Sequence, residues 1–273
     1  MRASKNNQTK SLMPLWCAVL AGLAWQTLWG GCPSVFAADA SSSVLRLANG
    51  EWPPYTGRHL PGQGCDSQVV TEAFAMEGVR VEYEFLPWAR GLLLSQNGVV
   101  DGAVEWAGTA EQRQTHFVNS DPLSRQEWVF FHHRETSYSW EHLDDLKDRT
   151  IGLTIGYAYN DVFADLRKQQ PAMFTEAASD LLNFKKLLSG RIDLFPIERA
   201  VGYFLIKKDL SPEERAKLAE DPKPLAEFTP YLLLSRVVPG NEQRMQLFDR
   251  GLQQLKANGR YQAIMAPCSP EGQ

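Results

Sequence analysis

The chain has 273 residues, with 28 Lys and Arg against 32 Asp and Glu, which gives a net charge of −4 at pH 7. This mildly acidic balance argues against nucleic acid or an anionic membrane surface as partner, and no basic stripe interleaved with aromatic residues contradicts it. Neither clustered His and Cys nor a phosphate-binding glycine motif occurs, so we expect no metal ion and no cofactor.

The first 37 residues have the composition of a secretory signal. Arg2, Lys5 and Lys10 precede an almost uncharged segment, Leu12–Trp29, and small residues follow near Ala37. This order predicts a signal peptide, residues 1–37, cleaved after Ala37, and export to the periplasm. A retained membrane anchor and a lipoprotein signal with Cys32 as the acylated residue stay open as alternatives.

The mature chain is long enough for two lobes of about 100 residues each. Removal of residues 1–37 takes away three basic and no acidic residues, so the net charge becomes −7. Cys65 and Cys268 are then the only cysteines left. Their even number in an oxidising compartment permits a disulfide, but their spacing alone does not establish one.

Strands and helices alternate along the mature chain, which predicts an α/β protein with mostly parallel sheets. In the first part we expect Asp66 to cap a helix that ends at Gly78, and the other elements are strand 45–48, strand 79–85, helix 88–96 and strand 99–106. The same alternation begins again with strand 150–155, helix 160–169, helix 181–188 and strand 192–197. The restart predicts two lobes of similar construction.

Ligands of open α/β sheets bind beyond the carboxyl ends of the strands, in this case in a cleft between the two lobes. The loop after the first strand carries two aromatic residues on a proline-stiffened backbone, which suits one wall of a site. The third strand ends in an acidic and an aromatic residue. The arginine that follows this strand can hold a carboxylate with two hydrogen bonds. In the second half of the chain, an acidic residue follows the last strand. These residues are Trp52 and Tyr55, Glu105 and Trp106, Arg113, and Glu198.

Several short motifs in order make the chain resemble the family-3 extracellular solute-binding proteins, the type II periplasmic binding proteins typical of polar amino-acid ABC transporters. The motifs are Trp52-Pro53-Pro54-Tyr55, Pro87-Trp88-Ala89-Arg90-Gly91, Asn97-Gly98-Val99-Val100-Asp101-Gly102, Arg113 with Ser120-Asp121-Pro122, Asp145-Leu146-Lys147, Gly190-Arg191-Ile192-Asp193 and Gly259-Arg260-Tyr261-Gln262.

The resemblance implies two lobes that close on a small ligand by a hinge motion. Lobe 1 would comprise residues 41–133 and 229–273, and lobe 2 residues 134–228. The chain would cross between them at 130–133 and at 228–232. The protein would be a monomer that delivers its ligand to an ABC permease of the inner membrane.

The resemblance also implies roles for single residues. Arg113 stands where the family places its carboxylate-binding arginine, and Glu198 where an acid holds the α-amino group. Tyr157 stands where many members have a small hydroxyl residue, and Ala110 where they have Thr. A ligand other than a standard α-amino acid therefore stays open, with Arg90 as a further anion-binding residue.

Two other classes of function remain as alternatives. The same fold serves periplasmic dehydratases that act on cyclohexadienyl acids, and Glu105 or Glu198 would then be the acid in the cleft. A sensory binding protein without a transporter is the second alternative. We expect a non-catalytic binding protein, because no second catalytic group is spaced to assist either carboxylate.

Overall fold

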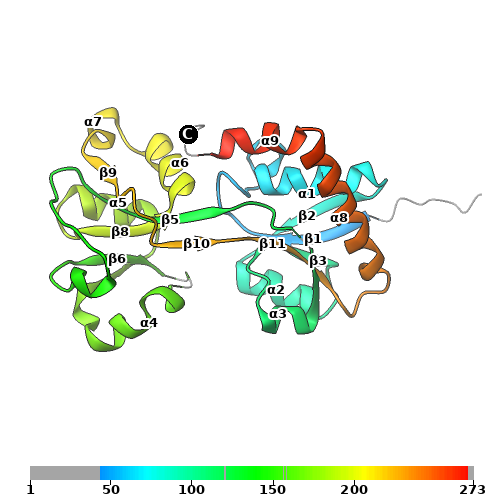
Figure 1. Ribbon diagram of the computed structural model, residues 1–273, viewed down its shortest axis with the longest axis horizontal. Helices are drawn as coiled ribbons and strands as arrows, with labels where there is room; N and C mark the ends of the chain where they lie inside the picture. Colours follow the sequence, from blue (N-terminus) through cyan, green and yellow to red (C-terminus); the bar gives the residue numbers. More distant parts are fainter. Residues whose placement is uncertain (1–43, 120, 156, 158, 270–273) are drawn as a thin grey trace, which may run out of the picture. The chain divides into compact units, whose positions relative to one another are not determined.

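The structure is a computed structural model that describes residues 44–119, 121–155, 157 and 159–269. It is a mixed α/β protein with its strands in two sheets, as predicted from the alternating elements (Figure 1). The predicted signal peptide lies outside the described residues. No helix in the described part of the chain is long and apolar enough to cross a membrane.

The first sheet has the strand order β2-β1-β3-β11-β4. Strand β1 pairs in parallel with β2 and β3, whereas β11 is antiparallel to β3 and β4. The strands are β1 (Val44–Asn49), β2 (Arg80–Phe85), β3 (Gly102–Trp106), β4 (His116–Val118) and β11 (Tyr231–Ser235).

Helices cover both faces of the first sheet (Figure 1). Leu45 and Leu47, alternate residues of β1, are fully buried in the main core cluster with apolar residues of α1 and α8. Ala48 belongs to a smaller cluster, against which Leu94 of α2 packs. This alternation follows from the two-residue period of a strand. The helices are α1 (Cys65–Met76), α2 (Trp88–Gln96), α3 (Ala110–Thr115), α8 (Asn241–Ala257) and α9 (Arg260–Met265).

The second sheet has the order β10-β5-β8-β6-β7, with β9 paired to the far end of β5. Strands β6, β7 and β8 are parallel, and β5 runs antiparallel to its neighbours β8, β9 and β10. The strands are β5 (Gln126–His133), β6 (Ile151–Thr154), β7 (Phe174–Ala177), β8 (Leu194–Glu198), β9 (Leu218–Glu220) and β10 (Ala226–Phe228).

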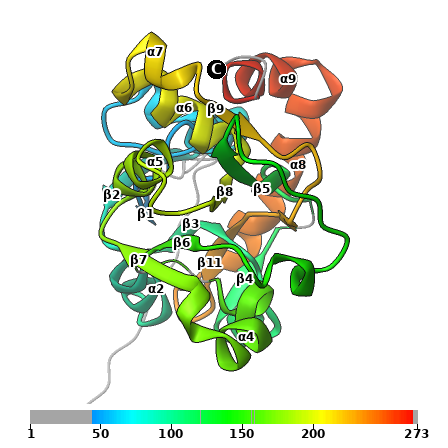
Figure 2. The same ribbon diagram turned by 90° about the vertical axis from the view of Figure 1, so that its left-hand side faces the viewer.

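Helix α4 lies on one face of the second sheet and helices α5 and α6 on the other (Figures 1 and 2). Successive residues of β5 serve the two faces: Phe130 packs on Phe163 of α4, and Phe131 on Phe184 of α5. The helices are α4 (Asn160–Gln169), α5 (Asp180–Leu188), α6 (Arg199–Asp209) and α7 (Pro212–Arg215), and short 3-10 turns are η1 (Pro61–Gln63), η2 (Leu143–Leu146), η3 (Pro171–Met173) and η4 (Ala266–Cys268).

The first passage between the sheets lies earlier in the chain than we expected. The chain leaves the first sheet after Val118 and enters the second at Gln126, whereas the expected crossing was 130–133. Residues 128–132 instead pair with β8, because the apolar side chains of β5 fill the core on both faces. The return passage lies between Phe228 and Tyr231.

The start of α1 differs in two respects from the sequence-based expectation. Gly64, at a φ of 96°, is the N-cap, and Asp66 is a fully buried residue of the first turn rather than the cap. Cys65 and Cys268 form a disulfide with a Cα–Cα distance of 6.3 Å. This bond ties the start of α1 to η4 near the end of the described chain.

Candidate functional site

A buried polar network occupies the carboxyl ends of strands from both sheets. Four of the expected site residues belong to it: Trp52 and Tyr55 after β1, Glu105 in β3, and Glu198 at the end of β8. Each of the four side chains is at most 9% exposed. The position agrees with the rule that places ligand sites of α/β sheets beyond the strand ends.

The loop after β1 is held by its own backbone. Trp52 and Thr56 form an antiparallel bridge, and the Thr56 hydroxyl donates a hydrogen bond of 2.8 Å to the Gly50 carbonyl. A Cβ atom on Gly50 would lie 2.3 Å from the Trp88 ring, so the first turn of α2 packs directly on this loop. These contacts give Trp52 and Tyr55 a fixed support.

Glu198 links the two sheets through Tyr55. The Tyr55 hydroxyl donates a 3.1 Å hydrogen bond to Glu198 Oε1, and the backbone N–H of Val201 donates one of 2.8 Å to Oε2. Glu198 is therefore the N-cap of α6. Burial raises the pKa of Glu198 to about 7, although both hydrogen bonds act to lower it.

Glu105 and Asp66 form a buried pair of carboxyl groups. Gln126 Nε2 donates a 2.5 Å hydrogen bond to Glu105 Oε1, and the Ser124 hydroxyl donates one of 2.8 Å to Asp66 Oδ2. The other oxygen of each carboxyl group has no donor among the described residues. Burial and the interaction between the two carboxyl groups favour one shared proton, which would give these two oxygens the donor that they lack.

The pKa values of this pair agree with a shared proton. Burial raises the pKa of Asp66 to about 6. Burial, and then the negative charge of Asp66, raise the pKa of Glu105 well above its ordinary value. Glu105 also has a left-handed backbone with a φ of 71°, which non-glycine residues rarely adopt and which often marks functional sites. The pair therefore carries less than two negative charges at neutral pH.

Four aromatic rings lie beside the polar network. Trp52 stacks on Trp128 with a centroid distance of 5.9 Å and meets Tyr157 edge-on at 5.3 Å, and Tyr159 meets Trp128 edge-on at 5.6 Å. The Trp52 indole N–H donates a 3.2 Å hydrogen bond to Gln126 Oε1. Trp128 and Tyr157 are half-buried, so part of this aromatic surface is accessible.

Tyr157 is fixed from the other side by Asp180. Its hydroxyl donates a 2.6 Å hydrogen bond to Asp180 Oδ2, while the Thr154 hydroxyl donates one of 2.6 Å to Oδ1. Burial raises the pKa of both Tyr157 and Asp180 above their ordinary values. The ring of Tyr157 is thus oriented toward Trp52 by a charge-assisted contact.

The three remaining expected residues lie outside the buried network. Arg113 is exposed on α3, where its Nε donates a 2.9 Å hydrogen bond to the Gly108 carbonyl and its guanidinium lies 5.9 Å from the Tyr231 ring centroid. Arg90 is exposed on α2 and has no hydrogen bond or ion pair among the described residues. Trp106 is half-buried and packs edge-on against Trp88.

Sequence reasoning missed several members of the site. Gln126, Trp128, Tyr159 and Asp180 were not singled out, and Asp66 was interpreted only as a helix cap. The polar residues that begin β5 carried a signal, since a strand that starts with Gln and Glu before an apolar run has a polar end that needs partners. The partners themselves come from distant elements and leave no local pattern.

The sequence matches the family model of the bacterial extracellular solute-binding proteins, family 3, over residues 47–267. No match was found among the curated proteins. Among solved structures, a histidine kinase sensor domain with similarity to periplasmic binding proteins superimposes with a TM-score of 0.65, at 17% identity, over 81% of this chain and 94% of its own.

Two ligand-bound structures are similar to the same extent. An ancestral arginine-binding protein bound to arginine has a TM-score of 0.64 at 19% identity and covers 81% of this chain and 96% of its own. The GluR0 ligand-binding core from Nostoc punctiforme, in complex with L-glutamate, has a TM-score of 0.62 at 17% identity. It covers 83% of this chain and 99% of its own. Identities this low show the fold alone. The superpositions confirm the predicted two-lobed fold of periplasmic binding proteins.

Proposed function

Because the chain belongs to the bacterial extracellular solute-binding proteins of family 3, we infer that it is an exported protein that captures a small amino-acid-like or carboxylate-bearing ligand between its two lobes. The observation that carries this proposal is the position of the polar network. Side chains at or just beyond the carboxyl ends of strands of both sheets converge there, as in the hydrogen bond from Tyr55 to Glu198. A site built from both lobes is what capture by closure requires.

The accessible groups near the strand ends suit an anionic ligand with an apolar part. Arg113 presents exposed guanidinium N–H groups that can hold a carboxylate with two hydrogen bonds. Arg90 offers a second exposed guanidinium. The half-buried rings of Trp128 and Tyr157 offer an apolar wall. Glu198 serves an ammonium group once its bond to Tyr55 is released.

Closure would follow from differential affinity. A ligand stabilises the closed form only as far as it binds that form more tightly than the open one. Tyr55–Glu198 and the stack of Trp52 on Trp128 join residues of the two sheets, so they are contacts that opening would break. The two passages, residues 119 and 121–125 and residues 229–230, are the segments that would bend.

Export and delivery complete the proposal. A signal peptide cleaved after Ala37 would place the protein in the periplasm, with lipoprotein anchoring at Cys32 as the alternative. An ABC permease would read the closed form and accept the ligand. Mass spectrometry of the mature protein tests the first step, because a chain that begins at residue 38, one acylated at Cys32 and one of full length have different masses.

A thermal-shift screen tests the binding function. Purified residues 38–273 are heated with amino acids, polyamines and small organic acids, one at a time. A ligand that binds only the native state raises the melting temperature in proportion to the logarithm of its concentration. We expect a carboxylate-bearing compound to do so, and a screen in which only compounds without a carboxylate raise it would contradict the proposed ligand class.

An enzyme of the same fold is the second candidate. The raised pKa of Glu198, about 7, favours it, since a carboxylic acid that keeps its proton near neutral pH can act as a general acid. Incubation of the protein with prephenate or arogenate, followed by chromatography of the products, decides between the two. We expect no turnover, and turnover that disappears in Glu198→Gln would establish the enzyme.

A further inference from the structure

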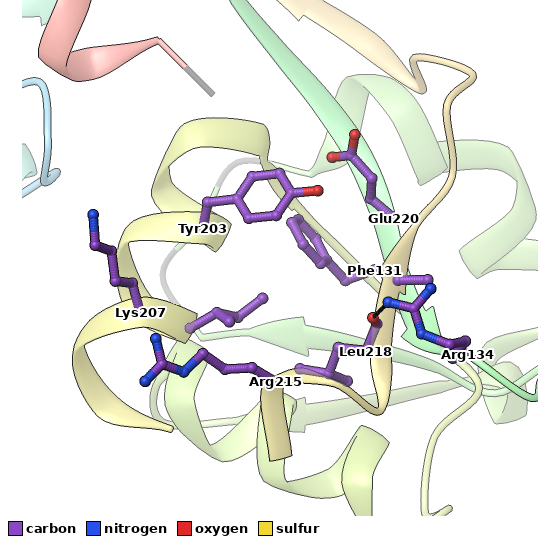
Figure 3. Close-up of a pocket in the computed structure, with 9 residues that line it drawn as sticks. Phe131, Arg134, Tyr203, Lys207, Arg215, Leu218 and Glu220 are labelled. Carbon is purple, nitrogen blue, oxygen red and sulfur yellow. Dashed lines mark hydrogen bonds between the residues drawn. The ribbon is translucent and has the colours of Figure 1, made fainter. Parts of the chain in front are cut away.

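A cavity of about 530 Å³ lies at the end of the second sheet remote from the polar network. It is formed by the end of β5, by β9, by the last turns of α6 and by α7 (Figure 3). Its volume falls within the range of about 300–1,000 Å³ that small-molecule sites occupy. Along α6, residue 207 in its wall lies about 13 Å from residue 198 in the network, at 1.5 Å of rise per residue.

The floor of this cavity is apolar. Phe131, Ile206 and Leu218 line it, and all three are buried. The Tyr203 ring stands edge-on to Phe131 with a centroid distance of 5.5 Å, and its hydroxyl points toward Glu220 (Figure 3). An apolar body, aromatic or branched, would therefore find complementary contacts on the floor.

Three cationic side chains surround this floor. Arg134 is held in place by its own hydrogen bonds, from Nε to the Ala216 carbonyl and from a terminal nitrogen to the Leu218 carbonyl, both 2.9 Å. Lys207 is exposed, and Arg215 is half-buried. The Nε of Arg215 is buried and has no hydrogen-bond acceptor among the described residues. An anion that supplies an acceptor oxygen to this buried N–H would therefore bind favourably.

One acidic side chain lines the cavity, and it is already paired. Glu220 Oε2 lies 3.2 Å from Arg199 Nε, and Arg199 in turn lies 2.7 Å from Glu127 Oε2. Its negative charge is therefore directed to Arg199. The electrostatic balance of the cavity wall favours an anion.

We propose that this cavity is a second ligand site, separate from the strand-end network, for a small carboxylate with an aromatic or branched apolar body. The apolar part would lie on Phe131 and Leu218, and the carboxylate would accept hydrogen bonds from Lys207 and Arg215. Two of the four elements that form the site, β5 and α6, also reach the strand-end network through Gln126 and Glu198.

The test uses 3-phenylpropionate as probe and isothermal titration calorimetry or ligand-detected NMR as readout. The variant Lys207→Gln with Arg215→Gln removes two cavity cations. The matched control, Lys208→Gln with Lys217→Gln, removes two exposed cations next to them in the sequence that do not line the cavity. We expect the dissociation constant to rise about tenfold in the first double variant and to stay unchanged in the control.

Three further measurements make the result decisive. The neutral analogue 3-phenylpropanol should bind more weakly than the carboxylate, and Arg113→Ala should leave binding of the probe unchanged. If the double variant fails to fold, Lys207→Gln alone replaces it, because it alters only an exposed residue. It should raise the dissociation constant of the probe about threefold. No binding of the probe to the unaltered protein, equal binding by the two double variants, or loss of binding in Arg113→Ala would each overturn the proposal.

Discussion

The hydroxyl of Tyr55, in the loop after β1, donates a hydrogen bond to the buried carboxyl group of Glu198 at the end of β8. One residue belongs to a loop of the first sheet and the other to a strand of the second. The bond therefore serves two purposes. It satisfies a polar group that is 2% exposed, and it joins the two sheets at the strand ends.

Removal of this hydroxyl should lower the stability of the protein. Tyr55→Phe leaves Glu198 Oε1 without its donor, and a buried acceptor that loses a hydrogen bond costs about 1–2 kcal/mol. Urea unfolding at pH 8, followed by circular dichroism, measures the loss. Tyr231→Phe is the control, since its hydroxyl has no hydrogen bond to any residue that the structure describes, and it should change the free energy of unfolding by less than about 0.5 kcal/mol. Equal effects of the two variants would contradict the role given to Tyr55.

The buried carboxyl groups predict that stability falls as pH rises. The pKa values of Asp66, Glu105 and Glu198 are all raised in the folded state, to about 6 for Asp66 and about 7 for Glu198. The folded protein therefore binds more protons than the unfolded one, and stability present below about pH 4 is lost as pH rises through these values. Urea unfolding at pH 5 and pH 8 should give a free energy of unfolding lower at pH 8 by on the order of 2 kcal/mol.

Glu105→Gln should reduce this dependence on pH. The amide can accept from Gln126 and donate to Asp66, so it replaces the shared proton without adding charge. We expect the variant to be more stable than the unaltered protein at pH 8, by about 1–2 kcal/mol, and nearly equal at pH 5. A free energy of unfolding that rises from pH 5 to pH 8 in the unaltered protein would show that the pair is not protonated as described.

The disulfide should stabilise the protein considerably. It joins Cys65 to Cys268 across a sequence separation of 203 residues and fixes η4 against the start of α1. The double variant Cys65→Ser with Cys268→Ser should lose about 2–5 kcal/mol of unfolding free energy. A reductant should lower the stability of the unaltered mature protein and have no effect on the double variant. Two free thiols in a titration of the denatured, unreduced mature protein would exclude the bond.

The elements of the fold could be predicted from sequence because they rest on local patterns. Alternating apolar residues give β2, and helical spacing with a glycine stop gives α1. The turns Gly98–Asp101 and Gly190–Asp193, each of which begins with Gly and ends with Asp, have a common structural role. Asp101 and Asp193 each accept a 2.7 Å hydrogen bond from the backbone N–H of a residue in or next to a neighbouring strand, Arg46 and Thr150. The first passage between the sheets was predicted too late in the chain, because the sequence of an apolar strand does not show to which of the two sheets the strand belongs.

The site could be predicted only in part, for a related reason. Trp52 and Tyr55 follow a strand, Glu105 and Glu198 lie at or near the end of one, and position relative to a strand is visible in sequence. The interaction of Asp66 with Glu105 joins the first turn of α1 to β3, two elements far apart in the chain, and no local spacing encodes it. The same holds for Asp180, which meets Tyr157 from the start of another helix.

Calorimetric titration of Arg113→Ala with a ligand that the thermal-shift screen identifies shows whether Arg113 holds that ligand at the strand ends. Arg191→Ala, which removes an exposed arginine from a turn of the second sheet, is the matched control. We predict a loss of affinity of more than about thirtyfold in Arg113→Ala, with an unchanged melting temperature of the free protein and unchanged affinity in the control. Equal affinity of Arg113→Ala and the unaltered protein would show that Arg113 does not hold the ligand.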